Sequence, residues 1–294
     1  MIRIAPEVAD ALRERRAVVA LETTLIAHGF PAGEGLEVGR ASEAAVREAG
    51  AVPATVGVLD GELVVGLSAD ELERFDAGAR KLGSRDLAAA AVQRAVGATT
   101  VGGTLAACSA AGIRVLATGG LGGVHRGWPQ PPDVSSDLGS LARTRALVVS
   151  SGVKSLLDVP ATAEMLETLG VPVLGWRTDE LPLFYTARGG PSVSARVESV
   201  AEAARIAAAH WQLGGGGLLL GRPPDESLDD VEPLIAAALG AAESAGVRGG
   251  AVTPFVLDRL HRASGGRTLR ANRDLVVGNA RLAGEIAVAL AATT

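Results

Sequence analysis

Residues 17–28 read Ala-Val-Val-Ala-Leu-Glu-Thr-Thr-Leu-Ile-Ala-His and contain the pattern that decides the fold. The run before the glutamate is continuously apolar rather than alternating, which indicates a strand buried on both faces of a sheet. Such strands occur mainly in parallel sheets whose two faces are covered by helices. The run ends at Glu22, so an ionisable side chain stands at the carboxyl end of the strand.

The same pattern recurs along the chain, separated by helical stretches. Besides residues 17–22, short apolar runs predict strands at 54–60, 114–118, 146–150, 171–175 and 217–221. Helices are predicted at 34–49, 85–96, 199–210, 231–245 and 269–290. This alternation favours the α/β class, with α/β/α layers around a mainly parallel central sheet. The glycine tract at 214–217 is interpreted as a turn into a strand, so residues 1–294 are expected to form one domain.

The composition excludes several classes of protein. A net charge of −5 and 3% aromatic residues leave neither a basic excess nor many stacking surfaces for nucleic acid. The single cysteine, Cys108, excludes an intramolecular disulfide and a multi-cysteine metal site. The chain shows no apolar run of about 20 residues and no apolar signal core. We therefore expect a cytoplasmic protein that binds neither nucleic acid nor membrane.

Polar side chains follow three of the predicted strands, at the sheet edge where ligands of open α/β sheets bind. Glu22 ends the first, a glycine-rich loop at 119–127 containing His125 follows the second, and Lys154 follows the third. The glycine-rich loop matches neither a Walker loop nor the dinucleotide-binding fingerprint. It predicts a close approach of backbone to ligand, although His125 is equally compatible with a packed loop residue.

Only two of the 28 basic residues are lysines, Lys81 and Lys154. Lysine can lose its proton and act as a nucleophile, whereas arginine stays charged. A desolvated Lys154 amine would form a Schiff base with an aldehyde-level carbon. A phosphate contact at a helix N-terminus is supported about equally. Lys81 lies in a polar turn, which suits either a phosphate contact or a solvated surface.

The carboxylates also allow two interpretations each. Burial would raise the pKa of Glu22 and suit it to general acid catalysis, but a strand-end carboxylate can also be structural. Asp133 and Asp137, with two serines between them, would suit a hard cation such as Mg²⁺ or Mn²⁺. The same pattern is also typical of a helix N-cap with an acidic first turn, and this second interpretation is favoured.

Together these segments resemble the pseudouridine-5'-phosphate glycosidase family, also called indigoidine synthase A-like, along nearly the whole chain. The longer matching pieces are ALETTLIAHG at 20–29, ATGG at 117–120, DVSSDL at 133–138, GVKSLLD at 152–158 and AVTPF at 251–255. Shorter pieces at 53–61, 81–87, 97–101, 124–127 and 178–185 fall in the same order as in the family. No piece is decisive alone, and the ordered set carries the resemblance.

The resemblance implies an enzyme that cleaves the C–C bond between ribose 5-phosphate and C5 of uracil. It implies Glu22 as proton donor and Lys154 as the nucleophile that holds ribose as an iminium. Substrate contacts are implied for Lys81, Val101, Thr118, His125, Ser135, Ser136, Asp137 and Asn272. Asp133 is implied as the ligand of Mn²⁺ or another divalent cation such as Mg²⁺, held largely through water. The family resemblance also implies a homotrimer.

Three segments depart from the family pattern and put the exact substrate in doubt. Arg222-Pro223-Pro224-Asp225 replaces Asn-Pro-Ile-Pro, Trp176-Arg177 replaces a smaller pair, and residues 273–278 depart from the usual Ile-Ala-Leu-Val-x-Asn. One alternative is therefore the same chemistry on another C-nucleoside phosphate. Others are a ribokinase-like sugar-phosphate kinase, for which a Gly-x-Gly-Asp motif is lacking, and a sugar-phosphate binding module without catalysis.

Overall fold

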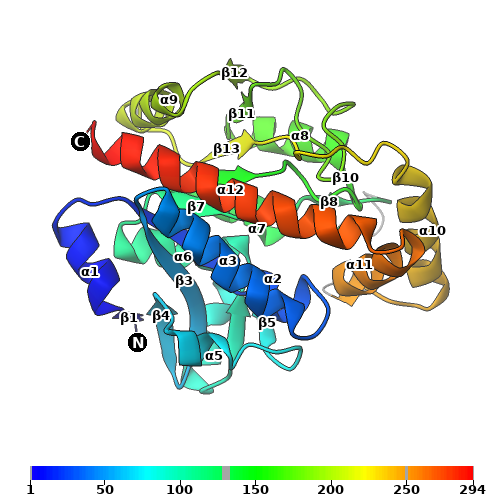
Figure 1. Ribbon diagram of the computed structural model, residues 1–294, viewed down its shortest axis with the longest axis horizontal. Coiled ribbons are helices and arrows are strands. Elements are labelled where there is room, and N and C mark those ends of the chain that lie inside the picture. The colour runs from blue at the N-terminus through cyan, green and yellow to red at the C-terminus, as the bar shows by residue number, and fades with distance from the viewer. Residues whose placement is uncertain (1, 128–132, 249–250, 294) are drawn as a thin grey trace.

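A computed structural model describes residues 2–127, 133–248 and 251–293. The predicted strands lie side by side in one sheet (Figure 1). The strands are β1 (Ile2–Ile4), β2 (Val18–Glu22), β3 (Val52–Leu59), β4 (Glu62–Val65), β5 (Arg80–Leu82), β6 (Gly97–Thr99), β7 (Val115–Ala117), β8 (Val124–His125), β9 (Leu147–Ser150), β10 (Leu157–Asp158), β11 (Val173–Trp176), β12 (Ala195–Val197) and β13 (Leu218–Gly221). The helices are α1 (Pro6–Arg13), α2 (Thr24–His28), α3 (Glu34–Glu48), α4 (Ala69–Leu72), α5 (Leu87–Val92), α6 (Val101–Ala111), α7 (Ser136–Arg143), α8 (Val159–Thr168), α9 (Val200–Gln212), α10 (Glu232–Ser244), α11 (Val252–Ala263) and α12 (Arg267–Ala291), with a 3-10 turn η1 (Ser84–Asp86).

The centre of the sheet is parallel, as the sequence predicts. Strands β3, β2, β7, β9, β13, β11 and β12 are neighbours in that order and run in one direction. Antiparallel pairing occurs near one edge, where β4 and β6 both pair with the long strand β3. A separate two-stranded ribbon joins β8 to β10. The carboxyl ends of β2, β7 and β9 therefore meet at one edge of the sheet.

Both faces of the sheet are covered, which explains the continuous apolar runs. Along β2, Val18 and Ala20 pack into one hydrophobic cluster and Val19 and Leu21 pack into another. Helices α3, α9 and α12 lie on the face toward the viewer in Figure 1, and α6 and α7 lie behind the sheet. The α/β fold with a mainly parallel sheet flanked by helices is confirmed.

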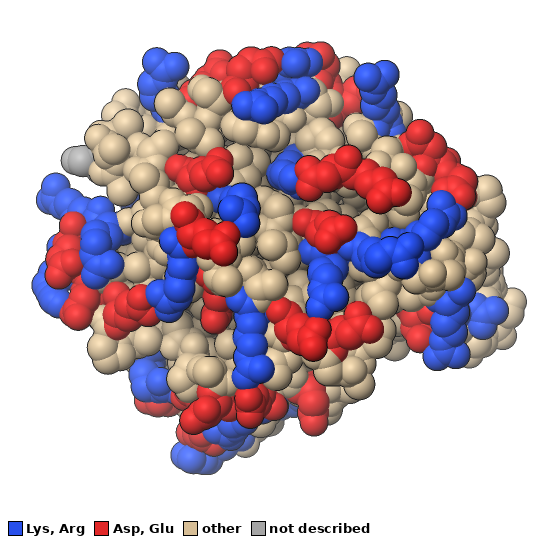
Figure 2. Space-filling view, in the orientation of Figure 1, with Lys and Arg blue, Asp and Glu red and all other residues tan. Residues whose placement is uncertain are grey.

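The outer surface of α3 and α12 carries charges of both signs. Figure 2 shows acidic and basic side chains interspersed over this face rather than gathered into one patch. Arg273 bonds Glu37 at 2.7 Å and Arg281 bonds Glu48 at 2.8 Å, so the pairs link the two helices. Each such exposed pair contributes about 0–1 kcal/mol.

Two local predictions can be compared directly with the structure. The helix predicted at 85–96 is shorter, because the turn η1 precedes α5 and residues 93–96 lie outside it. The glycine tract 214–217 is a turn into β13, as predicted. A Cβ at Gly216 would lie 1.9 Å from the Ala142 carbonyl oxygen, so close approach to the end of α7 requires glycine there. None of the described helices is long and apolar enough to cross a membrane.

Candidate active site

The carboxyl ends of three neighbouring parallel strands place Glu22, Thr118 and Lys154 together. Glu22 is the last residue of β2, Thr118 follows β7, and Lys154 lies four residues beyond β9. A small enclosed cavity opens at this edge, and it is lined by Glu22, Thr24, Leu25, His28, Gly29, Lys81, Gly120, Lys154, Ser155, Leu156, Phe184, Thr253, Pro254, Leu257 and Asn272. The structure thus brings together four of the predicted site residues, Glu22, Lys81, Lys154 and Asn272.

Glu22 is a buried carboxyl group with one side-chain partner. Its side chain is 4% exposed, and Oε1 accepts a hydrogen bond from the Thr118 hydroxyl. Burial raises the pKa of Glu22, and the charge of Asp137 raises it further. The charges of Lys154 and Lys81 and the Thr118 hydrogen bond act in the opposite direction but do not cancel the effect of burial. Glu22 is therefore suited to hold and deliver a proton.

Lys154 reaches the same cavity from a loop that is shaped by the glycine-rich segment. A Cβ at Gly120 would lie 2.6 Å from the Phe184 ring and 3.2 Å from Cγ of Lys154. The absence of a side chain at Gly120 thus allows both residues to pack against this loop. Lys154 is half-buried, and its backbone N–H donates to the Leu121 carbonyl at 3.2 Å. The amine is consequently sheltered by protein while remaining next to the cavity.

Lys81 reaches the cavity from a different part of the fold. It lies in the short strand β5, which pairs with β6. Lys81 as a whole is exposed, and its side chain lines the cavity. The cavity walls desolvate the ammonium group and the charge of Lys154 repels it, so both lower the pKa of Lys81. The charges of Asp137 and Glu22 raise the pKa of Lys81 but do not cancel this effect. The backbone before β5 is held by His28, whose Nε2 lies 2.9 Å from the Ala79 carbonyl oxygen. Two lysines at one cavity make this site suited to an anionic ligand.

Asp137 links the beginnings of two helices beside the cavity. Its Oδ1 accepts hydrogen bonds from the Gly102 backbone N–H at 2.7 Å and the Thr100 hydroxyl at 3.2 Å, both at the start of α6. The Ser135 hydroxyl accepts from the Asp137 N–H at 3.2 Å and caps α7. The helix-cap interpretation of this segment is therefore confirmed. A Cβ at Gly122 would lie 2.5 Å from Asp137 Oδ2, so the glycine-rich loop also allows this close approach.

The remaining predicted contacts surround the cavity without lining it. Val101 is the first residue of α6 and is buried, and Ser136 begins α7, with its hydroxyl close to Gly83 just after β5. His125 ends β8, and its Nδ1 lies 3.8 Å from Oδ2 of Asp133. Among the described residues no group of three or more His, Cys, Asp or Glu side chains could hold a metal.

Asn272 carries the clearest unsatisfied polar group of the cavity. Its side chain is 1% exposed, and Nδ2 donates weakly to the Gly29 carbonyl at 3.4 Å. Its Oδ1 is buried and has no partner in the part of the chain that the structure describes. Because a buried unsatisfied oxygen is costly, an N–H or O–H of a ligand is its natural partner.

Several site residues lie outside the candidates that the sequence predicted. Phe184 and the Thr253–Leu257 stretch of α11 line the cavity, but only their motif similarity draws attention to them. Asn279 on α12 was also missed. Its Nδ2 donates to the Thr118 carbonyl at 2.9 Å and to the Ser151 hydroxyl at 3.1 Å, so it joins the ends of β7 and β9. No local pattern links residues so far apart in the sequence.

The departures from the family pattern lie outside the cavity. Arg222 is largely buried, bonds Asp225, and packs against Gly278, where an added Cβ would lie 2.8 Å from the guanidinium. Arg177 lies over the ring of Trp176, with its guanidinium carbon 4.9 Å from the centroid. Arg222 and the Trp176-Arg177 pair therefore do not line the cavity around Glu22 and Lys154.

A buried acid and a sheltered lysine at the carboxyl edge of a parallel sheet define an α/β enzyme with a lysine in its active site. The family model described as Indigoidine synthase A like protein matches residues 7–289. The chain therefore belongs to the pseudouridine-5'-phosphate glycosidase, or Indigoidine synthase A-like, family.

Individual relatives are similar over their full length. The pseudouridine-5'-phosphate glycosidase of Chloroflexus aurantiacus is 49% identical, with 98% of each chain covered. That of Streptomyces griseus is 50% identical, covering 98% of this chain and 92% of the relative.

Two solved structures share the fold. The prealnumycin C-glycosynthase AlnA, in complex with ribulose 5-phosphate, has a TM-score of 0.90 and 45% identity, with 100% of this chain and 98% of that chain covered. The indigoidine synthase A-like protein of Thermotoga maritima has a TM-score of 0.88 and 39% identity, with 99% and 97% covered.

Proposed function

We propose that this protein is a pseudouridine-5'-phosphate glycosidase that reversibly cleaves the C–C bond between C1′ of ribose 5-phosphate and C5 of uracil. The observation that carries the proposal is the shared cavity of Glu22 and Lys154. Cleavage of a C–C glycosidic bond needs a proton for the departing carbon and a group that can hold C1′ at the aldehyde level. A buried acid and a lysine amine supply these two requirements.

The proposed reaction proceeds in three steps. The ring bond between C1′ and O4′ breaks, O4′ takes a proton, and Nζ of Lys154 bonds to C1′ with loss of a proton. Glu22 then protonates C5, and the C1′–C5 bond breaks with its electron pair remaining on uracil while the lysine nitrogen forms an iminium with C1′. Water adds to the iminium and releases ribose 5-phosphate and the free amine.

The surrounding groups have complementary roles in this proposal. Lys81 offers a positive charge for the phosphate, and the unpartnered Oδ1 of Asn272 accepts a hydrogen bond from an N–H or O–H of the substrate. Burial keeps Glu22 protonated, and the negative charge of Asp137, held by the start of α6, acts in the same direction. The contacts expected of Val101, Thr118, His125, Ser135 and Ser136 remain proposals.

A hard divalent cation, Mn²⁺ or Mg²⁺, is proposed at Asp133. Such ions keep several waters and often bind through one or two carboxylates, so a single partly exposed aspartate fits them. The cation would neutralise negative charge of the bound substrate. Residues 128–132, which precede Asp133, lie outside the described residues.

Borohydride trapping tests the proposal directly. Protein, pseudouridine 5'-phosphate and Mn²⁺ are mixed, uracil is measured, and the reduced adduct is mapped by mass spectrometry. Because the chain has two lysines, the position of an adduct is unambiguous. We expect the wild type to carry reduced ribose on Lys154. The matched control Lys81→Arg should also form the adduct, whereas Lys154→Arg should form none. Absence of both uracil and adduct in the wild type refutes the proposal.

A C-glycosynthase acting on another aromatic partner is the second candidate. It is favoured by the 45% identity to AlnA, which is near the identity to the glycosidases. A panel of C-nucleoside phosphates distinguishes the two, because a higher kcat/KM for another aglycone would favour this candidate. The family assignment favours the glycosidase and the C-glycosynthase over a ribokinase-like kinase. A binding module without catalysis would keep its ligand binding and full function with Lys154→Arg.

The remaining features of the proposal concern the whole chain. The continuous sheet with helices on both faces supports a single domain over residues 1–294. The family resemblance supports a homotrimer, which light scattering of the purified protein would test. A cytoplasmic location is proposed as well, and cell fractionation would test it.

A further inference from the structure

A second cavity lies at the opposite end of the sheet from the active site. Its volume is about 730 Å³, and it is lined by Leu12, Arg15, Arg16, Ala17, Val18, Gly112, Ile113, Arg114, Val115, Arg145, Ala208, Trp211, Gln212, Ala287, Leu290 and Ala291. Strand β2 begins at Val18 in this cavity and ends at Glu22 in the active site. Four steps of about 3.3 Å separate the two residues by about 13 Å, so the cavities are distinct.

The charge of this second cavity is positive. Four arginines line it, and no Asp or Glu does so among the described residues. The carboxylate of Glu14 pairs with Arg16 at the rim, whereas no ion pair of Arg15, Arg114 or Arg145 is found in the described part of the chain. Helices α1, α6, α9 and α12 end here with partial negative charges of about half a unit each. The four guanidinium charges outweigh these helix ends and Glu14 together.

Arg114 is held in place before any ligand arrives. Its guanidinium carbon lies 5.5 Å from the centre of the Trp211 ring, and its Nη1 donates to the Arg145 carbonyl at 3.1 Å. The ring itself is fixed because Nε1 of Trp211 donates to the Gly216 carbonyl at 2.8 Å. The glycine turn before β13 thus supports a rigid wall of the cavity. A fixed guanidinium loses less entropy when it binds an anion.

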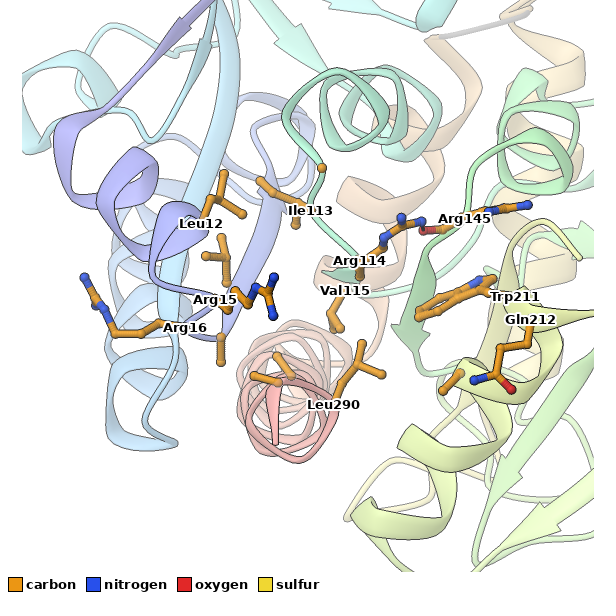
Figure 3. A pocket seen from close by; sticks show the side chains of 16 residues that line it. Leu12, Arg15, Arg16, Ile113, Arg114, Val115, Arg145, Trp211, Gln212 and Leu290 are labelled. Atoms are coloured by element: carbon orange, nitrogen blue, oxygen red, sulfur yellow. Dashed lines mark hydrogen bonds between the residues drawn. The ribbon is translucent and has the colours of Figure 1, made fainter. Parts of the chain in front are cut away.

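Arg15 faces Arg114 across the cavity. Figure 3 places Arg15 beside the end of α1, Arg114 and Trp211 on the other side, and Leu290 of α12 between them. Arg15 has a φ of 56°, in the left-handed region that favours glycine after a helix end. A guanidinium is therefore kept at a position where glycine would be less strained.

We infer that this cavity binds a nucleotide, with the polyphosphate between Arg15 and Arg114 and the base against the apolar and aromatic wall. Guanidinium groups bind phosphate oxygens in a bidentate manner. The half-buried Leu12 side chain and Trp211 ring supply a surface for a planar base, and Gln212 offers an amide for its polar edge. The cavity lies in the size range of small-molecule and cofactor sites, well above the size of a phosphate group.

Calorimetric titration of the full chain with ATP tests this inference, with ribose 5-phosphate in excess to fill the active site. We expect one ATP per chain, bound equally well by Lys154→Ala. Arg114→Gln and Arg15→Gly should each weaken binding about tenfold, the loss of one charge-assisted contact. Arg15→Gly relieves the left-handed strain, so weaker binding by this variant cannot be ascribed to unfolding.

The matched control is Arg205→Gln, on α9 like Trp211 but outside the cavity lining, which should bind as the wild type does. Absence of binding at millimolar ATP overturns the inference. The inference is also overturned if ribose 5-phosphate displaces ATP, or if Arg205→Gln weakens ATP binding as much as Arg114→Gln does. Binding of inorganic triphosphate as tight as that of ATP would overturn it as well. None of these measurements depends on glycosidase activity. A failure of the nucleotide inference therefore does not count against the proposed function.

Discussion

At the scale of single residues, the two lysines should respond differently to the same conservative change. Arginine retains the positive charge but is not nucleophilic, so Lys154→Arg should lower kcat by about a thousandfold or more. Lys81→Arg can still contact a phosphate and should mainly raise KM. Steady-state kinetics with pseudouridine 5'-phosphate measures both changes. Wild-type turnover by Lys154→Arg would contradict the assigned roles.

Thr118 should set the pH range in which Glu22 works as an acid. Its hydroxyl donates to the Glu22 carboxylate and lowers a pKa that burial has raised. Thr118→Val removes this stabilisation of the charged form, so the pKa of Glu22 rises further and the acid form persists to higher pH. The alkaline limb of the kcat/KM profile should therefore move upward, whereas Thr118→Ser should leave it in place. A downward movement would disprove the role.

The catalytic residues could be proposed from the sequence because each stands at the end of a recognisable strand or within a few residues of it. Glu22 ends β2 and Lys154 follows β9, and parallel strands end at a common edge. The rest of the cavity could not be found this way. Phe184 and Asn272 reach the cavity from segments whose position depends on tertiary packing. Asp137 accepts a hydrogen bond from the start of α6 and also acts on Glu22 through its charge.

At the scale of elements, alanine substitution at two glycines should have opposite effects on stability. A Cβ at Gly216 would lie 1.9 Å from a backbone oxygen of α7, so Gly216→Ala should destabilise the fold by about 3 kcal/mol. At Gly240, on the exposed side of α10, a Cβ would have open space. Gly240→Ala should gain about 1 kcal/mol of helix propensity. Urea unfolding measures both, and equal effects would refute the argument.

Whether a helix or strand can be predicted from the sequence depends on which of its faces are buried. The central strands are apolar on both faces, so continuous runs identified them within one or two residues. The short strands β5, β6, β8 and β12 carry no such run, because tertiary pairing rather than local pattern makes them extended. Helix α6 was missed because residues 101–111 lack charged side chains, so they show no amphipathic pattern.

At the scale of the whole molecule, buried and half-buried histidines make stability depend on pH. Burial lowers the pKa of His28, His210 and His261, so the folded protein keeps these rings neutral. The unfolded chain binds protons on them near pH 6.5, about the ordinary histidine value. Below that pH the unfolded state holds more protons than the folded state. The contribution of these histidines to stability is therefore lost as the pH falls through the unfolded pKa toward the lower folded one.

His261 offers the sharpest test of this behaviour, because it is 7% exposed and both ring nitrogens lack partners among the described residues. The nearby charge of Asp258 raises its pKa but less than burial lowers it. His261→Leu removes the titrating group, so the variant should lose less stability than the wild type as the pH falls below about 6.5. Phe255→Leu, on the same helix, changes packing without titrating and should run parallel to the wild type. Urea unfolding across this range measures the difference, and a His261→Leu curve parallel to the wild type would show that this ring does not couple folding to pH.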